Sequence, residues 1–205
     1  IYFLTGKGGA GKSTLVREIK KRAKCVTCAS TGIAGLNVGG ITAHKLFGLK
    51  IGIMEPHHAH AIDRKWSAAV ENAQIIIVDE VSMIRADGMD GIDRTLRKTM
   101  QSNEPFGGKT MLFVGDAWQL APVVKELEET VLNARFRSPW FFDAGVFTGY
   151  KQLIPEDPAK LEIIELSRGF RQINGEFMNA LDLLRVGDPA GLKLINTRVG
   201  KPDKD

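Results

Sequence analysis

The decapeptide TGKGGAGKST at residues 5–14 constrains the fold of this chain more than any other stretch. It fits the phosphate-binding pattern G-x-x-x-x-G-K-S/T at every fixed position, between an apolar run at residues 1–4 and a helix-prone run at residues 15–19. A strand, a glycine-rich loop and a helix in this order surround an anion with backbone N–H groups and a helix N-terminus. The loop therefore predicts binding of a nucleoside triphosphate, and a glycine-rich turn without a ligand is the weaker interpretation.

Each fixed position of this loop has a chemical task. Lys12 is expected to reach the β- and γ-phosphates, and the Ser13 hydroxyl is expected to ligate Mg²⁺. Other positions turn backbone N–H groups toward the phosphates. We therefore expect the nucleotide to be held by Gly6, Gly8, Gly9, Ala10, Gly11, Lys12, Ser13 and Thr14.

Apolar, β-prone runs alternate with segments of helical spacing along the chain. The runs cover residues 1–5, 24–29, 74–79, 110–115 and 161–166. Helices are expected over residues 15–23, 90–100, 138–147 and 175–186. This alternation favours an α/β fold with a mostly parallel central sheet and helices on both faces.

The composition is that of an ordinary globular protein, because 43% of the 205 residues are hydrophobic and 25% are charged. The net charge of +4 is compatible with a nucleic-acid partner but too small to indicate one by itself. No apolar run reaches the length of a membrane span and no signal peptide is found, so we expect an intracellular protein without a membrane partner. Residue 1 is an isoleucine inside a predicted core strand, so we expect the parent protein to continue upstream.

Two groups of potential metal ligands have simpler explanations. Cys25 and Cys28 lie three residues apart in a predicted strand, so their side chains point to opposite faces and do not chelate one ion together. His57, His58 and His60 share one polar loop, but no carboxylate or cysteine stands at ligand spacing beside them. We expect free thiols and a solvated loop rather than a metal site.

Asp79 and Glu80 end the apolar run at residues 74–79. The carboxyl ends of parallel strands meet at one edge of the sheet, where the phosphate-binding loop also lies. There Asp79 is expected to hold Mg²⁺, and Glu80 is expected to position and deprotonate the attacking water. The alternative is an acidic start of a helix, which suits the helix dipole.

Gln119 follows the next predicted strand and is delivered to the same edge. Its amide can hydrogen-bond a γ-phosphate or the attacking water. The alternative is a simple turn in which Trp118 fills the core.

Six segments together resemble one family, the PIF-type DNA helicases, which are superfamily-one enzymes related to RecD. In chain order they are TGKGGAGKST, CASTGIAG, GGITAHKLFG, IIIVDEVSMI, PFGGKTMLFVGDAWQLAPV and ELSRGFRQINGEFMNALDLLRVG. They cover nearly the whole chain in the order and approximate spacing of the family. The resemblance implies a RecA-like P-loop NTPase fold and hydrolysis of Mg-ATP. It also implies 5′-to-3′ movement on single-stranded DNA and unwinding at junctions of single- and double-stranded DNA.

The resemblance also implies roles for individual residues. Lys12, Glu80 and Gln119 would be catalytic, together with Arg171, which matches the arginine that contacts the γ-phosphate from the same chain. A surface-paired arginine is the alternative for Arg171. The segments that match DNA-contacting segments of the family contribute Ser30, Thr31, Gly32, His44, Lys45 and Pro122.

Small hydroxyls and loop N–H groups suit phosphate contacts that carry no sequence information. Pro122 and Phe47 are candidates for stacking on bases, and core packing is an equal alternative for Phe47. The residue after His44 departs from the family pattern, which weakens the transfer of a role to Lys45.

The resemblance divides the chain into parts. Residues 1–47 and 67–190 would form the first RecA-like motor domain, and residues 48–66 fall where the family carries its small strand-separating subdomain. Residues 191–205 would be a tail or a linker to a missing second motor domain. The upstream glutamine-bearing segment that recognises adenine in the family is also absent.

Two other function classes stay open from the residues alone. A P-loop kinase of a small molecule would need an arginine-rich lid and an acceptor pocket, and it would not need Gln119 or the Ser30–Thr31 segment. A nucleotide-gated DNA-binding module would bind ATP without turnover. Stimulation of hydrolysis by single-stranded DNA distinguishes the helicase from both.

Overall fold

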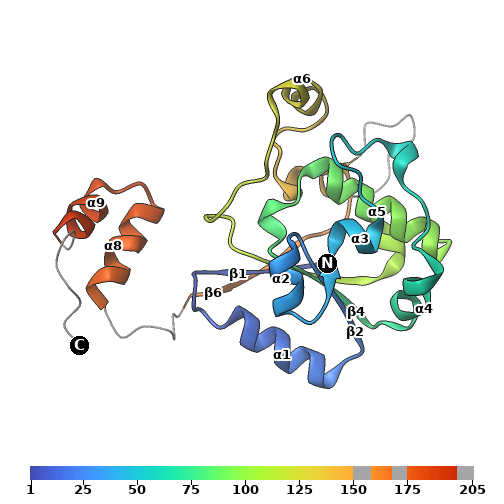
Figure 1. Ribbon diagram of the computed structural model, residues 1–205, viewed down its shortest axis with the longest axis horizontal. Coiled ribbons are helices and arrows are strands. Elements are labelled where there is room, and N and C mark those ends of the chain that lie inside the picture. Colours follow the sequence, from blue (N-terminus) through green and yellow to red (C-terminus); the bar gives the residue numbers. More distant parts are fainter. Residues whose placement is uncertain (150–157, 168–174, 198–205) are drawn as a thin grey trace.

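The strands of the central sheet follow the predicted apolar runs to within one residue, apart from one short addition. The computed structural model describes residues 1–149, 158–167 and 175–197. Within them the strands are β1 (Tyr2–Gly6), β2 (Cys25–Ala29), β3 (Ile41–Thr42), β4 (Ile75–Asp79), β5 (Thr110–Val114) and β6 (Glu162–Leu166). They form one sheet in the order β3-β2-β4-β5-β1-β6, and every pair is parallel (Figure 1). The predicted α/β fold with a parallel sheet is confirmed, and β3 was not predicted.

The helices match the sequence prediction less closely. They are α1 (Lys12–Arg22), α2 (Gly32–Asn37), α3 (Ala43–Phe47), α4 (Arg64–Asn72), α5 (Ala86–Met100), α6 (Glu126–Arg135), α7 (Gly145–Thr148), α8 (Gly175–Arg185) and α9 (Pro189–Asn196). Short 3₁₀ turns are η1 (Pro56–His58), η2 (Val81–Met83), η3 (Pro105–Gly108) and η4 (Phe141–Asp143). None of these helices has the length and apolar content that a membrane crossing requires.

The prediction of a continuous helix over residues 138–147 is wrong. Only η4 and α7 form there, because Trp140 and Ala144 have extended backbones that interrupt the helix. The apolar residues of this segment turn toward the core instead, and Phe141 is fully buried. The segment 191–205, expected to be a tail or a linker, contains most of α9. Helix α9 packs against α8 so closely that a Cβ at Gly191 would lie 2.5 Å from the carbonyl oxygen of Ala180.

The alternation of side chains along the strands gives the sheet two apolar faces, and helices cover both of them (Figure 1). One face is smaller and packs against α1 through Leu4, Val16, Ile77, Leu112 and Val114. The other face carries the main core, to which α3, α4, α5 and α7 contribute. Parallel strands buried on both sides need nearly continuous apolar runs, which explains why β4 reads as three isoleucines and a valine.

Helix α5 places three aspartates, as well as its apolar residues, in the interior. Asp87 accepts a hydrogen bond from Met54 N (2.7 Å), Asp90 from Val146 N (3.0 Å) and Asp93 from Phe106 N (2.6 Å). Burial raises the pKa of Asp90 to about 6. The three carboxylates lie one turn apart, so a single helix fastens three separate segments of the chain to the core.

Phe113 lies at the centre of an aromatic cluster, with ring centroids of Phe106, Phe141 and Phe147 at 5.7, 5.9 and 6.2 Å. We expect Phe113→Ala to lower the free energy of unfolding by about 4 kcal/mol, because the ring is fully buried and leaves a cavity. Phe142→Ala is the matched control: this ring is 37% exposed and stacks on Trp140, so we expect a loss of about 1 kcal/mol. Urea denaturation measures both, and equal losses would contradict the central position of Phe113.

Candidate active site

The carboxyl ends of β1, β4 and β5 bring the predicted catalytic segments to one edge of the sheet. The central strands lie in the order β4-β5-β1, so the loop after β5 lies between the phosphate-binding loop after β1 and the Asp79–Glu80 turn after β4. A Cβ added at Gly8 would lie 3.9 Å from Nε2 of Gln119, which places that amide against the phosphate-binding loop. Segments more than 100 residues apart in sequence therefore meet at one site.

The phosphate-binding loop has the backbone that its glycines permit. Gly9 and Gly11 have φ angles of 80° and 95°, a region that other residues rarely adopt. Lys12 opens helix α1, and its Nζ donates hydrogen bonds to the carbonyl oxygens of Gly6 (2.6 Å) and Lys7 (3.2 Å). The ammonium group is thus held over the loop, where a bound phosphate would lie.

Charges around Lys12 oppose the effect of its burial. Burial lowers the pKa of the Lys12 ammonium, while the carboxylates of Asp116 and Glu80 act in the opposite direction. An anionic phosphate placed beside Lys12 would likewise favour its charged form. An anion alone would be repelled by the carboxylates of Asp116 and Glu80. The site is therefore suited to an anion that binds together with a metal cation, because the cation offsets these negative charges.

Asp79 and Glu80 form a strained acidic turn. Glu80 has a φ of 52°, a left-handed conformation uncommon for residues other than glycine, and its N–H donates to Oδ1 of Asp79 (2.9 Å). Burial raises the pKa of both carboxyls, and the charge of Asp79 raises that of Glu80 further. A carboxylate whose pKa is raised in this way is a better proton acceptor at neutral pH.

The donor set fits Mg²⁺ bound together with a nucleotide. Among the described residues no group of three or more histidine, cysteine or carboxylate side chains is arranged to hold a metal. Mg²⁺ in a P-loop site does not need such a group, because one hydroxyl, one carboxylate, phosphate oxygens and water complete an octahedron of hard oxygen ligands. Ser13 is exposed at the start of α1, and Asp79 lies at the same sheet edge.

An ion pair that the sequence prediction missed supports the Gln119 loop. The carboxylate of Asp116 is 1% exposed and accepts two hydrogen bonds from Arg185 of α8, at 2.7 and 2.5 Å. The same carboxylate accepts from the N–H of Trp118 (3.0 Å), and the backbone carbonyl of Asp116 accepts from the N–H of Gln119 (3.1 Å), which shapes the turn. A second ion pair joins α8 to the phosphate-binding loop, between Asp182 and Lys7.

The residues expected to contact DNA lie after β2 and β3. Thr31 caps α2 by accepting a hydrogen bond from Ala34 N (3.2 Å), and Ser30 N donates to the carbonyl oxygen of Asp79 (3.1 Å). His44 and Lys45 are exposed on α3. The backbone after β2 is therefore bonded directly to the Asp79–Glu80 turn.

Two further expectations concern packing. Phe47 is 2% exposed and belongs to the core, so core packing is its observed role. Pro122 is buried as well, and its contact with DNA stays a prediction. Gly32 is exposed at the start of α2. Arg171 lies outside the described residues.

We expect Arg185→Ala to lower the free energy of unfolding by about 3 kcal/mol, because it leaves the buried carboxylate of Asp116 without its cation. Asp182→Asn is the control on the same helix. Its ion pair with Lys7 is more than a third exposed on both sides, so we expect less than about 1 kcal/mol. Thermal denaturation and limited proteolysis of α8 measure the two losses. A larger loss of stability in Asp182→Asn than in Arg185→Ala would show that the pair Asp182–Lys7, and not Asp116–Arg185, is the main support of this loop.

Comparison with known proteins identifies the family of this chain. The model of the PIF1-like helicases matches residues 1–140. The ATP-dependent DNA helicase PIF1 of Saccharomyces cerevisiae is 32% identical over 197 residues, which are 91% of this chain and 21% of that protein. Human PIF1 is 30% identical over 190 residues, which are 90% of this chain and 27% of that protein.

Solved structures agree with the sequence relatives. A crystal structure of a Pif1 helicase from Bacteroides in complex with ADP-AlF₃ and single-stranded DNA matches with a TM-score of 0.84 and 33% identity, over 100% of this chain and 47% of that one. The RecA-like fold expected from the resemblance is thereby confirmed. The chain spans less than half of this structure and about a quarter of the human relative. The matches to the family model, to the relatives and to the structure together show that the chain belongs to the PIF1-like helicase family.

Proposed function

We propose that this chain is the first motor domain of a DNA helicase and that it binds and hydrolyses Mg-ATP. In the whole protein, hydrolysis drives movement along single-stranded DNA and unwinding of duplex DNA. The observation that carries the proposal is the meeting of Lys12, Asp79, Glu80 and Gln119 at one sheet edge, with the backbone of Ser30 bonded to the acidic turn.

The residues divide the chemistry of hydrolysis among them. Lys12 holds the β- and γ-phosphates, and the backbone N–H groups of the loop complete the anion site. Glu80 orients the attacking water and accepts its proton, and Gln119 hydrogen-bonds the γ-phosphate or that water. Arg171, which is not among the described residues, is proposed to spread the charge of the transition state.

Mg²⁺, held by Ser13 and Asp79, would neutralise charge on the phosphates during transfer. Burial raises the pKa of both Asp79 and Glu80, which is consistent with two acidic groups that a cation would stabilise in their charged forms.

The DNA track is proposed to run over the loops that follow β2 and β3. Thr31 and Gly32 offer a hydroxyl and loop N–H groups to the DNA backbone, and His44 and Lys45 add exposed polar groups. Ser30 is proposed to act through its backbone, because its hydroxyl is buried. Because Ser30 is bonded to Asp79, a change at the ATP site reaches this track through a single hydrogen bond. Pif1 of Bacteroides has been crystallised with single-stranded DNA, which supports this partner for the present chain.

Translocation needs a second motor domain that closes on the first when ATP binds. The relatives are several times longer than this chain, which supports such a domain in the whole protein. Movement from 5′ to 3′, action at junctions of single- and double-stranded DNA, and location in a compartment that contains DNA belong to the same proposal.

Stimulation of ATP hydrolysis by single-stranded DNA tests the proposed function. We expect the full-length protein to hydrolyse ATP faster when an oligonucleotide is added, because the DNA loops contact the acidic turn. Phosphate release is the measurement. Hydrolysis that ignores DNA but responds to a small acceptor molecule would indicate a kinase, and binding of both ligands without turnover would indicate a nucleotide-gated module.

Two variants separate nucleotide binding from turnover. Lys12→Ala is expected to weaken ATP binding at least about 30-fold, because a charged hydrogen-bond donor to the phosphates is lost. Glu80→Gln is expected to keep ATP affinity and to lower kcat by about 10²- to 10⁴-fold, because the amide is not a base. Titration with a fluorescent nucleotide and phosphate release measure the two effects, and Lys21→Ala, an exposed lysine on α1, is the control. The same loss of ATP affinity in both variants would refute the assigned roles.

A further inference from the structure

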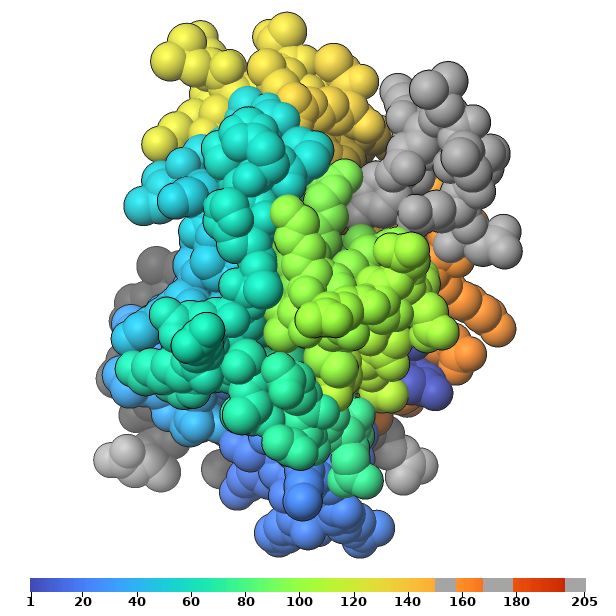
Figure 2. All heavy atoms as spheres, turned by 90° about the vertical axis from the view of Figure 1, so that its right-hand side faces the viewer, coloured from blue at the N-terminus to red at the C-terminus, as the bar shows by residue number. Residues whose placement is uncertain are grey.

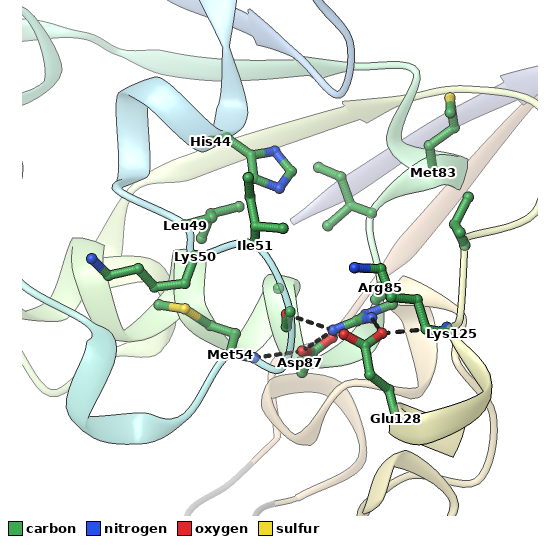
Figure 3. A pocket seen from close by; sticks show the side chains of 14 residues that line it. His44, Leu49, Lys50, Ile51, Met54, Met83, Arg85, Asp87, Lys125 and Glu128 are labelled. Atoms are coloured by element: carbon green, nitrogen blue, oxygen red, sulfur yellow. Dashed lines mark hydrogen bonds and ion pairs between the residues drawn. The ribbon is translucent and has the colours of Figure 1, made fainter.

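Arg85 joins three separate segments of the molecule. It lies five residues beyond Glu80, immediately before α5, and its side chain is 13% exposed. The guanidinium donates to Asp87 through Nε (2.9 Å) and Nη2 (2.7 Å), to Glu128 of α6 through Nη1 (2.5 Å) and to the carbonyl oxygen of Gly52 through Nη2 (2.8 Å). Figure 3 shows this network at the base of a cavity. A planar fork with several fixed donors is needed to reach three partners at once.

The inserted segment 48–66 is fastened along its length to α5 and α6. Asp87 accepts from Met54 N (2.7 Å), and Arg135 of α6 pairs with Glu55 (2.7 Å). Lys98 of α5 donates to the carbonyl oxygen of Ala59 (2.7 Å). In Figure 2 the cyan-to-teal surface of the insert lies against both the yellow α6 and the green α5. The insert is therefore attached to both helices and is not a separate unit.

The segments that meet at Arg85 both begin at the ATP site. One leads from Glu80 through η2 directly to Arg85, and the other leads from Gln119 to α6, where Glu128 lies nine residues beyond. A movement of the Glu80 turn would therefore shift Arg85, and a movement of the Gln119 turn would shift Glu128. These two residues form one ion pair. The third contact, with Gly52, passes the shift on to the insert.

Apolar packing between the insert and these segments is incomplete. A cavity of about 250 Å³ separates Ile51 and Met54 of the insert from Met83 and Val123 on the catalytic side. Ile51 and Val123 are 91% and 71% exposed. Because an open pocket lies between these apolar side chains, they do not pack against one another, and the polar network of Arg85 at the base of the pocket is a principal link between the two sides (Figure 3).

We infer that Arg85 is a positioning residue that holds the inserted segment in a fixed relation to the ATP site, so that ATP hydrolysis is converted into strand separation. The inference rests on the proposed helicase function and adds a residue that touches neither ATP nor the γ-phosphate. Loss of the network would loosen the link between the insert and the turns at Glu80 and Gln119, while the packing of Leu49 and Met54 in the main core keeps the insert folded.

Arg85→Lys and Glu128→Gln test this role in the full-length protein. Arg85→Lys keeps a cation beside the buried Asp87 but lacks the fork, and Glu128→Gln removes the charge on α6 while Arg85 keeps Asp87. Two quantities are measured, the ATP turnover stimulated by single-stranded DNA and the base pairs of a forked duplex unwound per ATP. We expect unchanged turnover and about 2- to 30-fold fewer base pairs per ATP, the range of effects along coupling networks.

Matched controls on α1 are Arg22→Lys, at an exposed position, and Glu18→Gln, whose side chain is 44% exposed. Melting temperatures establish that all variants fold. Unchanged base pairs per ATP in both test variants would overturn the inference. Losses of turnover and of unwinding by the same factor leave this ratio unchanged and are one form of that result, because the network would then only support the fold. Failure of the helicase proposal is separate, since the unaltered protein would then show no stimulation by DNA.

Discussion

The parallel pairing of β1 with its neighbours is the constraint on which the rest of the structure depends. Tyr2, Phe3 and Leu4 are in register with Leu112, Phe113 and Val114 of β5, so both strands run to the same edge of the sheet, where β1 extends two residues beyond the end of β5. The phosphate-binding loop and the Gln119 turn begin at that edge. A slip of one residue would turn the core side chains of β1 to the opposite face and move the loop away from the amide. The geometry of the candidate active site and the packing of the core are thus set by the same hydrogen-bond ladder.

A second constraint is the burial of acidic groups, which elsewhere in proteins is rare. Asp87, Asp90 and Asp93 each hold a segment of the main core through a backbone N–H group, and Asp116 does the same for the Gln119 turn. A buried carboxylate is stable only when its oxygen atoms are satisfied. The acidic residues therefore specify where loops attach, and they make those attachments sensitive to the loss of a single partner.

Much of the fold and of the proposed ATP site could be predicted from the sequence, for a physical reason. Strands buried on both faces have continuous apolar runs, and the residues that follow parallel strands reach one edge of the sheet. The sequence alone therefore places Lys12, Asp79, Glu80 and Gln119 at that edge. Short helices such as α2 and α3 carry no such local signal. Helix α6 does carry a local signal, because three glutamates lie in its first turn, but the sequence prediction missed this helix. The pair Asp116–Arg185 and the partners of Arg85 depend on chain segments far apart in sequence, and no periodicity reveals them.

The left-handed backbone of Glu80 has a consequence for how this chain balances stability against activity. Two successive residues of a regular strand face opposite sides of the sheet, and the turn at Glu80 ends that alternation, so its carboxyl and that of Asp79 both interact with Lys12. A residue other than glycine in this conformation costs of the order of 1 kcal/mol. Glycine would relieve that cost and remove the carboxyl. Folding and the proposed chemistry therefore favour different amino acids at this position, and the glutamate lowers stability at the point where the proposed hydrolysis needs a carboxyl group.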